Sequence, residues 1–175
     1  MKTDNFSLLI SKSVKNFKKT IYIDSDKSIS IRSFLIGSIS EGVSTINNVL
    51  ESEDVFSTIN CLKKLGVKIQ KRRPKEYLIY GKGLGSMFAK KNMDLHLGNS
   101  GTLARLLVGI LSTTPGIEVR LSGDSSLNKR NMKKLINLMT EFGAFFYPKH
   151  KFHFPLKLIS SEMPIGIKYK AGVSA

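Results

Sequence analysis

The chain has 175 residues, a length that suits one sizeable domain and argues against large multidomain machinery. Hydrophobic residues make up 41% and charged residues 23%, which is the composition of a globular protein and excludes a disordered or collagen-like chain. The 28 Lys and Arg residues exceed the 13 Asp and Glu residues, so the net charge of +15 favours partners that carry negative charge.

The basic residues do not form a nucleic-acid-binding motif. They are dispersed over four segments, residues 12–19, 63–75, 129–134 and 149–157. No zinc-finger spacing, RNP-type aromatic strand or helix-turn-helix accompanies them. We therefore expect no specific nucleic-acid partner, although a basic module for phosphorylated ligands or nucleic acid stays open on charge alone.

Membrane and secretory features are not expected either. The longest apolar stretches, such as residues 106–111, are far shorter than the roughly 20 residues of a membrane span. Residues 1–6 lack the apolar core and cleavage site of a signal peptide. The single cysteine, Cys61, cannot form an internal disulfide, which agrees with a reducing compartment. The sequence therefore predicts a cytoplasmic protein that does not contact a membrane.

An internal repeat organises the chain. Residues 24–98 and residues 99–166 contain the same kinds of element in the same order. Arg105 follows Arg32 by 73 residues, which gives the approximate length of one unit. Residues 167–175 match the start of a third unit.

Each unit is predicted to contain two helices of different character. The first is largely apolar and begins at a serine, Ser28 or Ser100, because serine caps helix N-termini. The second is amphipathic, with apolar residues on one stripe and Lys and Asn on the opposite face. It ends at Gly66 in the first unit and at Gly143 in the second.

Short strands complete each unit. They are expected over residues 43–50, 67–72, 76–81, 117–123, 144–148 and 156–159. The elements thus follow the order β-α-β-α-β-β, with one face of a small sheet packed on buried helices. This pattern predicts the α+β class, with about two units and the start of a third.

The N-terminal ends of the apolar helices are the predicted sites of chemistry. A helix N-terminus presents unpaired N–H groups and partial positive charge, so it binds phosphate or carboxylate. Lys27 stands just before Ser28, and Arg32 lies one turn further along the helix. This spacing lets an ammonium, a hydroxyl and a guanidinium converge on one anion.

The second unit offers a similar anion site. Residues 99–102 form a tight, Gly-containing turn whose backbone N–H groups can cradle an anion. Arg130, at the start of the following amphipathic helix, is a cation at a helix N-terminus, which is unfavourable unless an anion binds there. The residues that could support an anion here are Asn99, Ser100, Thr102 and Arg105.

Four motifs in register carry a family resemblance. They read DKSISIRSFLIGSISEG, LESEDVFSTINCLKKLGVKI, LGNSGTLARLL and LSGDSSLNKRNM. In this order and spacing they resemble the N-terminal half of the 5-enolpyruvylshikimate-3-phosphate synthase family, which transfers an enolpyruvyl group in the shikimate pathway of aromatic amino acid synthesis. The resemblance implies two similar domains, each with three copies of the β-α-β-α-β-β unit around buried parallel helices, and an active site in the cleft between them.

The resemblance implies contacts to shikimate 3-phosphate. Lys27, Ser28 and Arg32 match the family residues that bind this substrate. Ser174 matches the first serine of a Ser-Ser-Gln or Ser-Ala-Gln motif on its phosphate, and Ala175 takes the middle position.

The resemblance also implies a phosphoenolpyruvate site. Lys27 is expected to touch this substrate as well, Gly101 to line its site and Arg130 to hold its phosphate. The family needs no metal or organic cofactor. Glyphosate occupies the same site in the family, so Gly101 predicts a sensitive enzyme and Gly101→Ala a tolerant one.

The resemblance covers only part of the family's length. No catalytic residue is expected in this chain, because the family's general acid and base belong to the C-terminal half. We therefore expect the chain to be inactive without that half as its partner. Residues 1–23 would belong to a strand segment of the second domain's sheet, exposed or displaced here.

Two alternatives stay open. The first is the related UDP-N-acetylglucosamine enolpyruvyl transferase, which typically opens with Ala-Lys-Asn and carries a catalytic Cys in its second unit. This chain has Lys-Ser instead, and Cys61 lies in the first amphipathic helix, where an inert, buried thiol is the better interpretation. The second is the basic binding module.

Overall fold

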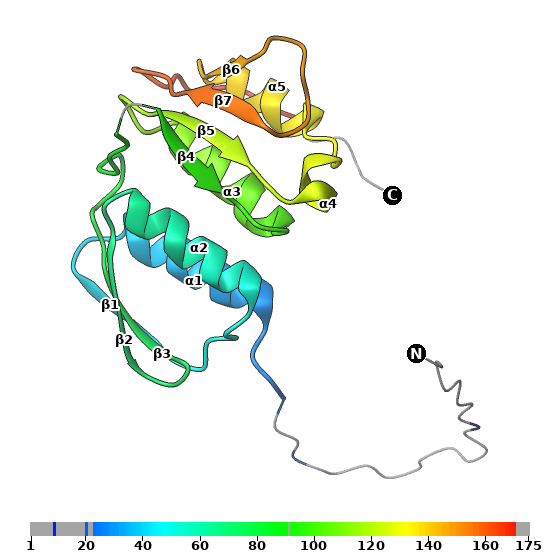
Figure 1. The fold of residues 1–175 in the computed structure, drawn as a ribbon. Helices are drawn as coiled ribbons and strands as arrows, with labels where there is room; N and C mark the ends of the chain where they lie inside the picture. Colours follow the sequence, from blue (N-terminus) through cyan, green and yellow to red (C-terminus); the bar gives the residue numbers. More distant parts are fainter. Residues whose placement is uncertain (1–8, 10–19, 21–22, 91, 171–175) are drawn as a thin grey trace.

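The computed structural model describes residues 9, 20, 23–90 and 92–170, and it folds them as two sheets with helices between and beside them (Figure 1). The first half contains α1 (Lys27–Ile39), β1 (Val43–Ile46), α2 (Glu53–Lys64), β2 (Lys68–Arg73) and β3 (Glu76–Tyr80). Its three strands form an antiparallel sheet in the order β1-β3-β2.

The second half repeats this order with one more strand at its start and one more short helix after its second strand. It contains β4 (Met93–His96), α3 (Gly101–Ser112), β5 (Glu118–Ser122), α4 (Ser125–Asn128), α5 (Lys133–Glu141), β6 (Phe145–Tyr147) and β7 (Leu156–Ile159). The sheet order is β4-β5-β7-β6, in which β4 and β5 are parallel and the other pairs antiparallel. Helix α3 connects the parallel pair, as a crossover between parallel strands requires.

The α+β class predicted from the repeat is confirmed. Strand β4 and the short helix α4 were not predicted, and β4 lies before residue 99 yet pairs with β5 of the second sheet. The strand expected over residues 43–50 ends at Ile46, because Asn48 has a φ of 55°, which breaks the extended conformation.

The start of α1 also differs from the prediction. Asp26, not Ser28, is the N-cap, and its Oδ1 accepts a hydrogen bond of 2.6 Å from the Ile29 amide. Lys27 is therefore the first helical residue rather than the residue before the helix. Helix α3 begins as predicted, because the Oγ of the buried Ser100 accepts a hydrogen bond of 3.2 Å from the Leu103 amide.

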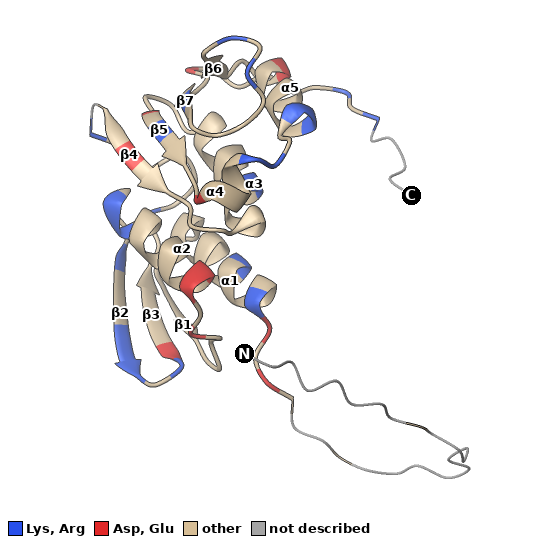
Figure 2. Ribbon diagram, turned by 45° about the vertical axis from the view of Figure 1, so that its right-hand side comes forward, with Lys and Arg blue, Asp and Glu red and all other residues tan. Residues whose placement is uncertain are grey.

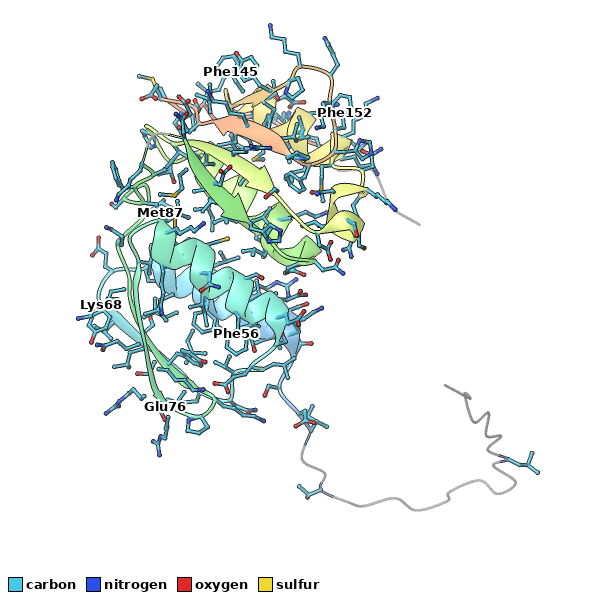
Figure 3. The ribbon with its side chains drawn as sticks, in the orientation of Figure 1. Phe56, Lys68, Glu76, Met87, Phe145 and Phe152 are labelled. Atoms are coloured by element: carbon cyan, nitrogen blue, oxygen red, sulfur yellow. The ribbon has the colours of Figure 1, made fainter. Side chains whose placement is uncertain are left out.

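The apolar helices form the centre of the core. Helix α1 lies against both α2 and α3. Phe34 of α1 is fully buried, and its ring meets Tyr77 of β3 edge-on, with centroids 5.3 Å apart. Met87, in the segment that joins the two sheets, is 5% exposed, whereas Phe145 on the edge strand β6 is 54% exposed (Figure 3).

Not every face of the apolar helices is covered. Ile29 and Ile36 of α1 are 64% and 61% exposed, and Leu106 of α3 is 39% exposed. None of the helices in the described part of the chain combines the length and the apolar character that a membrane span requires.

A carboxylate outside the core links the first sheet to the loop after β1. Glu51 pairs with the Lys71 ammonium at 2.8 Å and accepts a hydrogen bond of 2.8 Å from the Tyr77 hydroxyl. The hydrogen bond from Lys71, followed by that from Tyr77, lowers the pKa of Glu51 from 4.5 to about 2.

This depressed pKa predicts acid sensitivity. Because the folded-state pKa lies below the unfolded value, the contribution of Glu51 to stability is complete above about pH 4.5 and is lost as the pH falls toward 2. We expect the free energy of unfolding, measured with denaturant, to be larger for wild type than for Glu51→Gln at neutral pH. The two values should converge near pH 2. A difference that stays constant over this range would contradict the role of Glu51.

Candidate functional site

The N-terminal ends of three helices meet at one open depression of about 470 Å³. Its lining residues are Lys27, Ser28, Glu53, Asp54, Asn99, Gly101, Thr102, Arg105 and Arg130. They come from the first turns of α1 and α2, the first five residues of α3, the turn before α3, and the segment after α4. Figure 2 shows basic residues at the starts of α1 and α3 and acidic residues at the start of α2.

Helix α1 contributes an ammonium and a hydroxyl to the depression. Lys27 Nζ lies 2.8 Å from Asp54 Oδ2, and the Lys27 side chain is about half exposed. Ser28, half-buried, lines the depression beside it. Arg32 is exposed one turn further along α1 and is not among the lining residues, so the structure brings Lys27 and Ser28 together and leaves Arg32 beside the depression.

The turn before α3 positions two guanidinium groups. Arg130 Nη2 donates a hydrogen bond of 2.8 Å to Asn99 Oδ1. Arg105 Nη1 donates a long hydrogen bond of 3.4 Å to the Gly101 carbonyl. Both arginine residues are exposed, so their charged ends face the depression and solvent.

Gly101 makes room for these two cations. A Cβ atom at this position would lie 2.7 Å from Arg130 Nη1 and 2.9 Å from Arg105 Nη1. The missing side chain therefore lets both guanidinium groups approach the first turn of α3. Two like charges beside a helix N-terminus are unfavourable by themselves and become favourable when an anion binds between them.

The position of Arg130 differs from the sequence prediction. It follows α4, whose C-cap is Lys129, and precedes α5, which begins at Lys133. Arg130 is therefore not in the first turn of the amphipathic helix, and the helix N-terminus that it approaches is that of α3. The short helix α4 interrupts the link between β5 and α5 and was not visible in the sequence pattern.

Sequence reasoning missed the two carboxylates of the depression. Glu53 and Asp54 form the acidic first turn of α2, which Ser52 precedes. Such a Ser-Glu-Asp start is a common helix signal, so it indicated a helix N-terminus and not a site. Only the packing of α2 beside α1 places Asp54 against Lys27.

Cys61 takes no part in this site. Its thiol is buried in α2 and donates a hydrogen bond of 3.4 Å to the His96 carbonyl. Burial raises the pKa of the thiol to about 12, so it stays protonated. The burial predicted for this thiol is confirmed, and the raised pKa argues against a nucleophilic role.

The arrangement has the chemistry of a site for phosphate and carboxylate groups. Helix N-termini offer unpaired N–H groups and partial positive charge, and one lysine and two arginine residues add charge-assisted donors. In the described part of the chain, no group of three or more His, Cys, Asp or Glu side chains could hold a metal ion. Fold and site together define a repeated α+β protein with an anion-binding depression where helices α1, α2 and α3 begin.

Comparison with known proteins identifies the family. The family model for EPSP synthase (3-phosphoshikimate 1-carboxyvinyltransferase) matches residues 11–175. The chain therefore belongs to the EPSP synthase family. It is 36% identical over 166 residues to the 3-phosphoshikimate 1-carboxyvinyltransferase of Syntrophomonas wolfei, covering 95% of this chain and 38% of the relative. It is 45% identical over 132 residues to that of Caldicellulosiruptor saccharolyticus, covering 75% and 30%.

A solved structure supports the same assignment. EPSP synthase from Acinetobacter baumannii superposes with a TM-score of 0.77 at 33% identity, over 85% of this chain and 34% of that one. The chain thus spans about a third of the length of these relatives. Ser174 and Ala175, predicted to contact substrate, and most of residues 1–23 lie outside the described residues.

Proposed function

We propose that this chain contributes the shikimate 3-phosphate site and part of the phosphoenolpyruvate site to an active site that transfers an enolpyruvyl group from phosphoenolpyruvate to shikimate 3-phosphate. One observation carries this proposal: Lys27, Gly101 and Arg130, which are far apart in the sequence, line a single depression. Membership in the family indicates which reaction to expect. The cluster of cations indicates that the anionic substrates bind in this depression. We infer that the enzyme works in the cytoplasm, where its phosphorylated substrates occur.

Each substrate has its own group of donors in this proposal. Arg32 and Ser28 anchor shikimate 3-phosphate, Arg130 holds the phosphate of phosphoenolpyruvate, and Lys27 touches both. Bringing two anionic substrates into contact costs electrostatic repulsion, and fixed cations offset that cost. Ser174 and Ala175 would complete the shikimate 3-phosphate site.

The reaction that fits these groups is an addition followed by an elimination. The 5-hydroxyl group of shikimate 3-phosphate loses its proton as its oxygen attacks C2 of phosphoenolpyruvate, and C3 gains a proton. The tetrahedral intermediate then loses a proton from its C3 methyl group and the phosphate from C2, which restores the carbon–carbon double bond. The chain's own residues bind and orient the two anions and stabilise the departing phosphate. We assign the proton transfers to the remaining part of the enzyme.

A calorimetric titration at one fixed salt concentration tests this proposal. We expect saturable binding of shikimate 3-phosphate, no binding of UDP-N-acetylglucosamine, and only weak, salt-sensitive binding of duplex DNA. Binding of the UDP-sugar alone would favour the related transferase. Binding of DNA without shikimate 3-phosphate would favour a basic module and overturn the proposal.

Gly101→Ala should weaken binding of phosphoenolpyruvate. The new Cβ would lie within 3.0 Å of a guanidinium nitrogen of Arg130 and of Arg105, so both guanidinium groups must shift, which should disturb the hydrogen bond from Arg130 to Asn99. We expect about a fivefold loss of affinity in a titration, the worth of one hydrogen bond. In the complete enzyme, the same crowding should give tolerance to glyphosate.

Gly109→Ala is the matched control for this change. It lies in the same helix, but a Cβ there meets nothing within 4 Å. We expect the affinity of Gly109→Ala for phosphoenolpyruvate to equal that of wild type. Equal losses in the two variants would show that Gly101 has no special relation to the arginine residues.

A further inference from the structure

We propose that Asp54 is a positioning residue, which holds the Lys27 ammonium in the depression where it can capture an anion. The proposal rests on the proposed function, because it assigns a role in substrate binding to a residue that the sequence motifs did not single out. It starts from one contact, the 2.8 Å ion pair between Lys27 Nζ and Asp54 Oδ2.

The place of Lys27 in α1 explains why it needs a partner. A cation in the first turn of a helix is repelled by the partial positive charge of the helix N-terminus. The first turn of α1 contains no acidic residue, and the carboxylate of the N-cap Asp26 accepts a hydrogen bond from the Ile29 amide. Without a carboxylate from another element, the flexible lysine side chain would turn away into solvent.

Asp54 is well placed to supply that carboxylate. It lies in the first turn of α2, where the helix charge favours an anion, and its side chain is only 15% exposed. Its backbone is fixed by the helix, and its carbonyl accepts a hydrogen bond of 2.9 Å from Thr58 Oγ1. The ion pair therefore joins a rigid, mostly buried carboxylate to a mobile, half-exposed ammonium.

Two opposite effects follow when Asp54 loses its charge. Removing a negative charge from a cationic site should strengthen attraction for any anion. Releasing Lys27 should weaken capture, because the ligand must then immobilise a side chain with many rotamers. If Asp54 positions Lys27, the loss from releasing Lys27 is the larger effect, and the variant binds the anion more weakly. If Asp54 acts only through its charge, the variant binds the anion more tightly.

Asp54→Asn and Glu53→Gln in this chain separate the two effects. Both remove one negative charge from the same depression, but Glu53 is exposed, and no ion pair joins it to Lys27. We expect Asp54→Asn to bind phosphoenolpyruvate about three- to tenfold more weakly than wild type in a titration. Glu53→Gln should bind it slightly more tightly, and Asp54→Glu should recover part of the loss.

A second readout reports Lys27 directly and does not depend on substrate binding. Brief treatment with acetic anhydride, followed by peptide mass spectrometry, gives the acetylation rate of Lys27 relative to Lys149 in the loop after β6. We expect this rate to rise at least twofold in Asp54→Asn, to rise less in Asp54→Glu, and to match wild type in Glu53→Gln.

The two readouts keep the outcomes distinct. An unchanged Lys27 rate in Asp54→Asn overturns the proposal, and so does binding as tight as in wild type. If the wild-type chain binds neither substrate, the proposed function fails, and the acetylation rate alone still decides whether Asp54 positions Lys27. Thermal unfolding of each variant, recorded beforehand, sets a temperature at which all of them are folded.

Discussion

Replacing Arg130 by alanine is expected to lower the affinity of the chain for phosphoenolpyruvate by roughly tenfold to a hundredfold, the worth of one or two hydrogen bonds to a charged group. Arg130 follows α4, and its guanidinium donates a hydrogen bond of 2.8 Å to Asn99 Oδ1, in the turn just before α3. The hydrogen bond to Asn99 orients the guanidinium before the ligand binds. The alanine variant therefore loses both a positive charge and a preoriented hydrogen-bond donor. Isothermal titration calorimetry at fixed salt measures the effect.

Arg120→Ala is the control for the change in net charge. Arg120 lies on β5, away from the depression, and its exposed side chain pairs with Asp94 at 3.8 Å. Its removal lowers the charge of the chain by the same amount, so we expect a loss of affinity of less than about twofold, given the screening of distant charges. Similar losses in Arg120→Ala and Arg130→Ala would mean that phosphoenolpyruvate responds only to overall charge.

Phe34→Ala is expected to cost about 3–5 kcal/mol of folding free energy, because it removes a fully buried ring and leaves a cavity. Phe34 belongs to the central helix α1 and also meets Tyr77 of the first sheet. Since a domain of this size has a total stability of about 5–15 kcal/mol, the variant should be close to unfolding. Denaturant titration followed by circular dichroism measures the difference.

Phe145→Ala is the matched control, because it removes a phenyl ring from the surface instead of from the core. Phe145 lies on the edge strand β6 with 54% of its area exposed, so its loss should cost less than about 1 kcal/mol. If both variants lost the same stability, the central place of α1 in the core would be contradicted.

Much of the fold could be predicted because it repeats. Two apolar helices, two amphipathic helices and pairs of short strands recur with similar spacing, and periodicity reports such elements well. The exact ends of the helices were harder to predict from the sequence. Ser28 and Asp26 are both good caps, and only the hydrogen bond from Ile29 to Asp26 shows which one begins α1.

The candidate site was predictable where one chain segment carries several of its parts. Lys27 with Ser28, and residues 99–102, are local motifs at helix starts. The contact of Asp54 with Lys27, and the approach of Arg130 to α3, depend on how separate helices pack. No spacing along the chain contains that information, so these two relations required the structure.

Two-dimensional NMR of the isotope-labelled chain, titrated with shikimate 3-phosphate, tests the location of the site most directly. The measurement is the shift of each backbone amide signal. The anion-binding depression predicts saturable shifts concentrated in the first turns of α1 and α3, at residues 27–32 and 99–105. Shifts spread over the other basic segments, such as β2 and the start of α5, or no shifts in a folded chain, would contradict a substrate site at the helix N-termini.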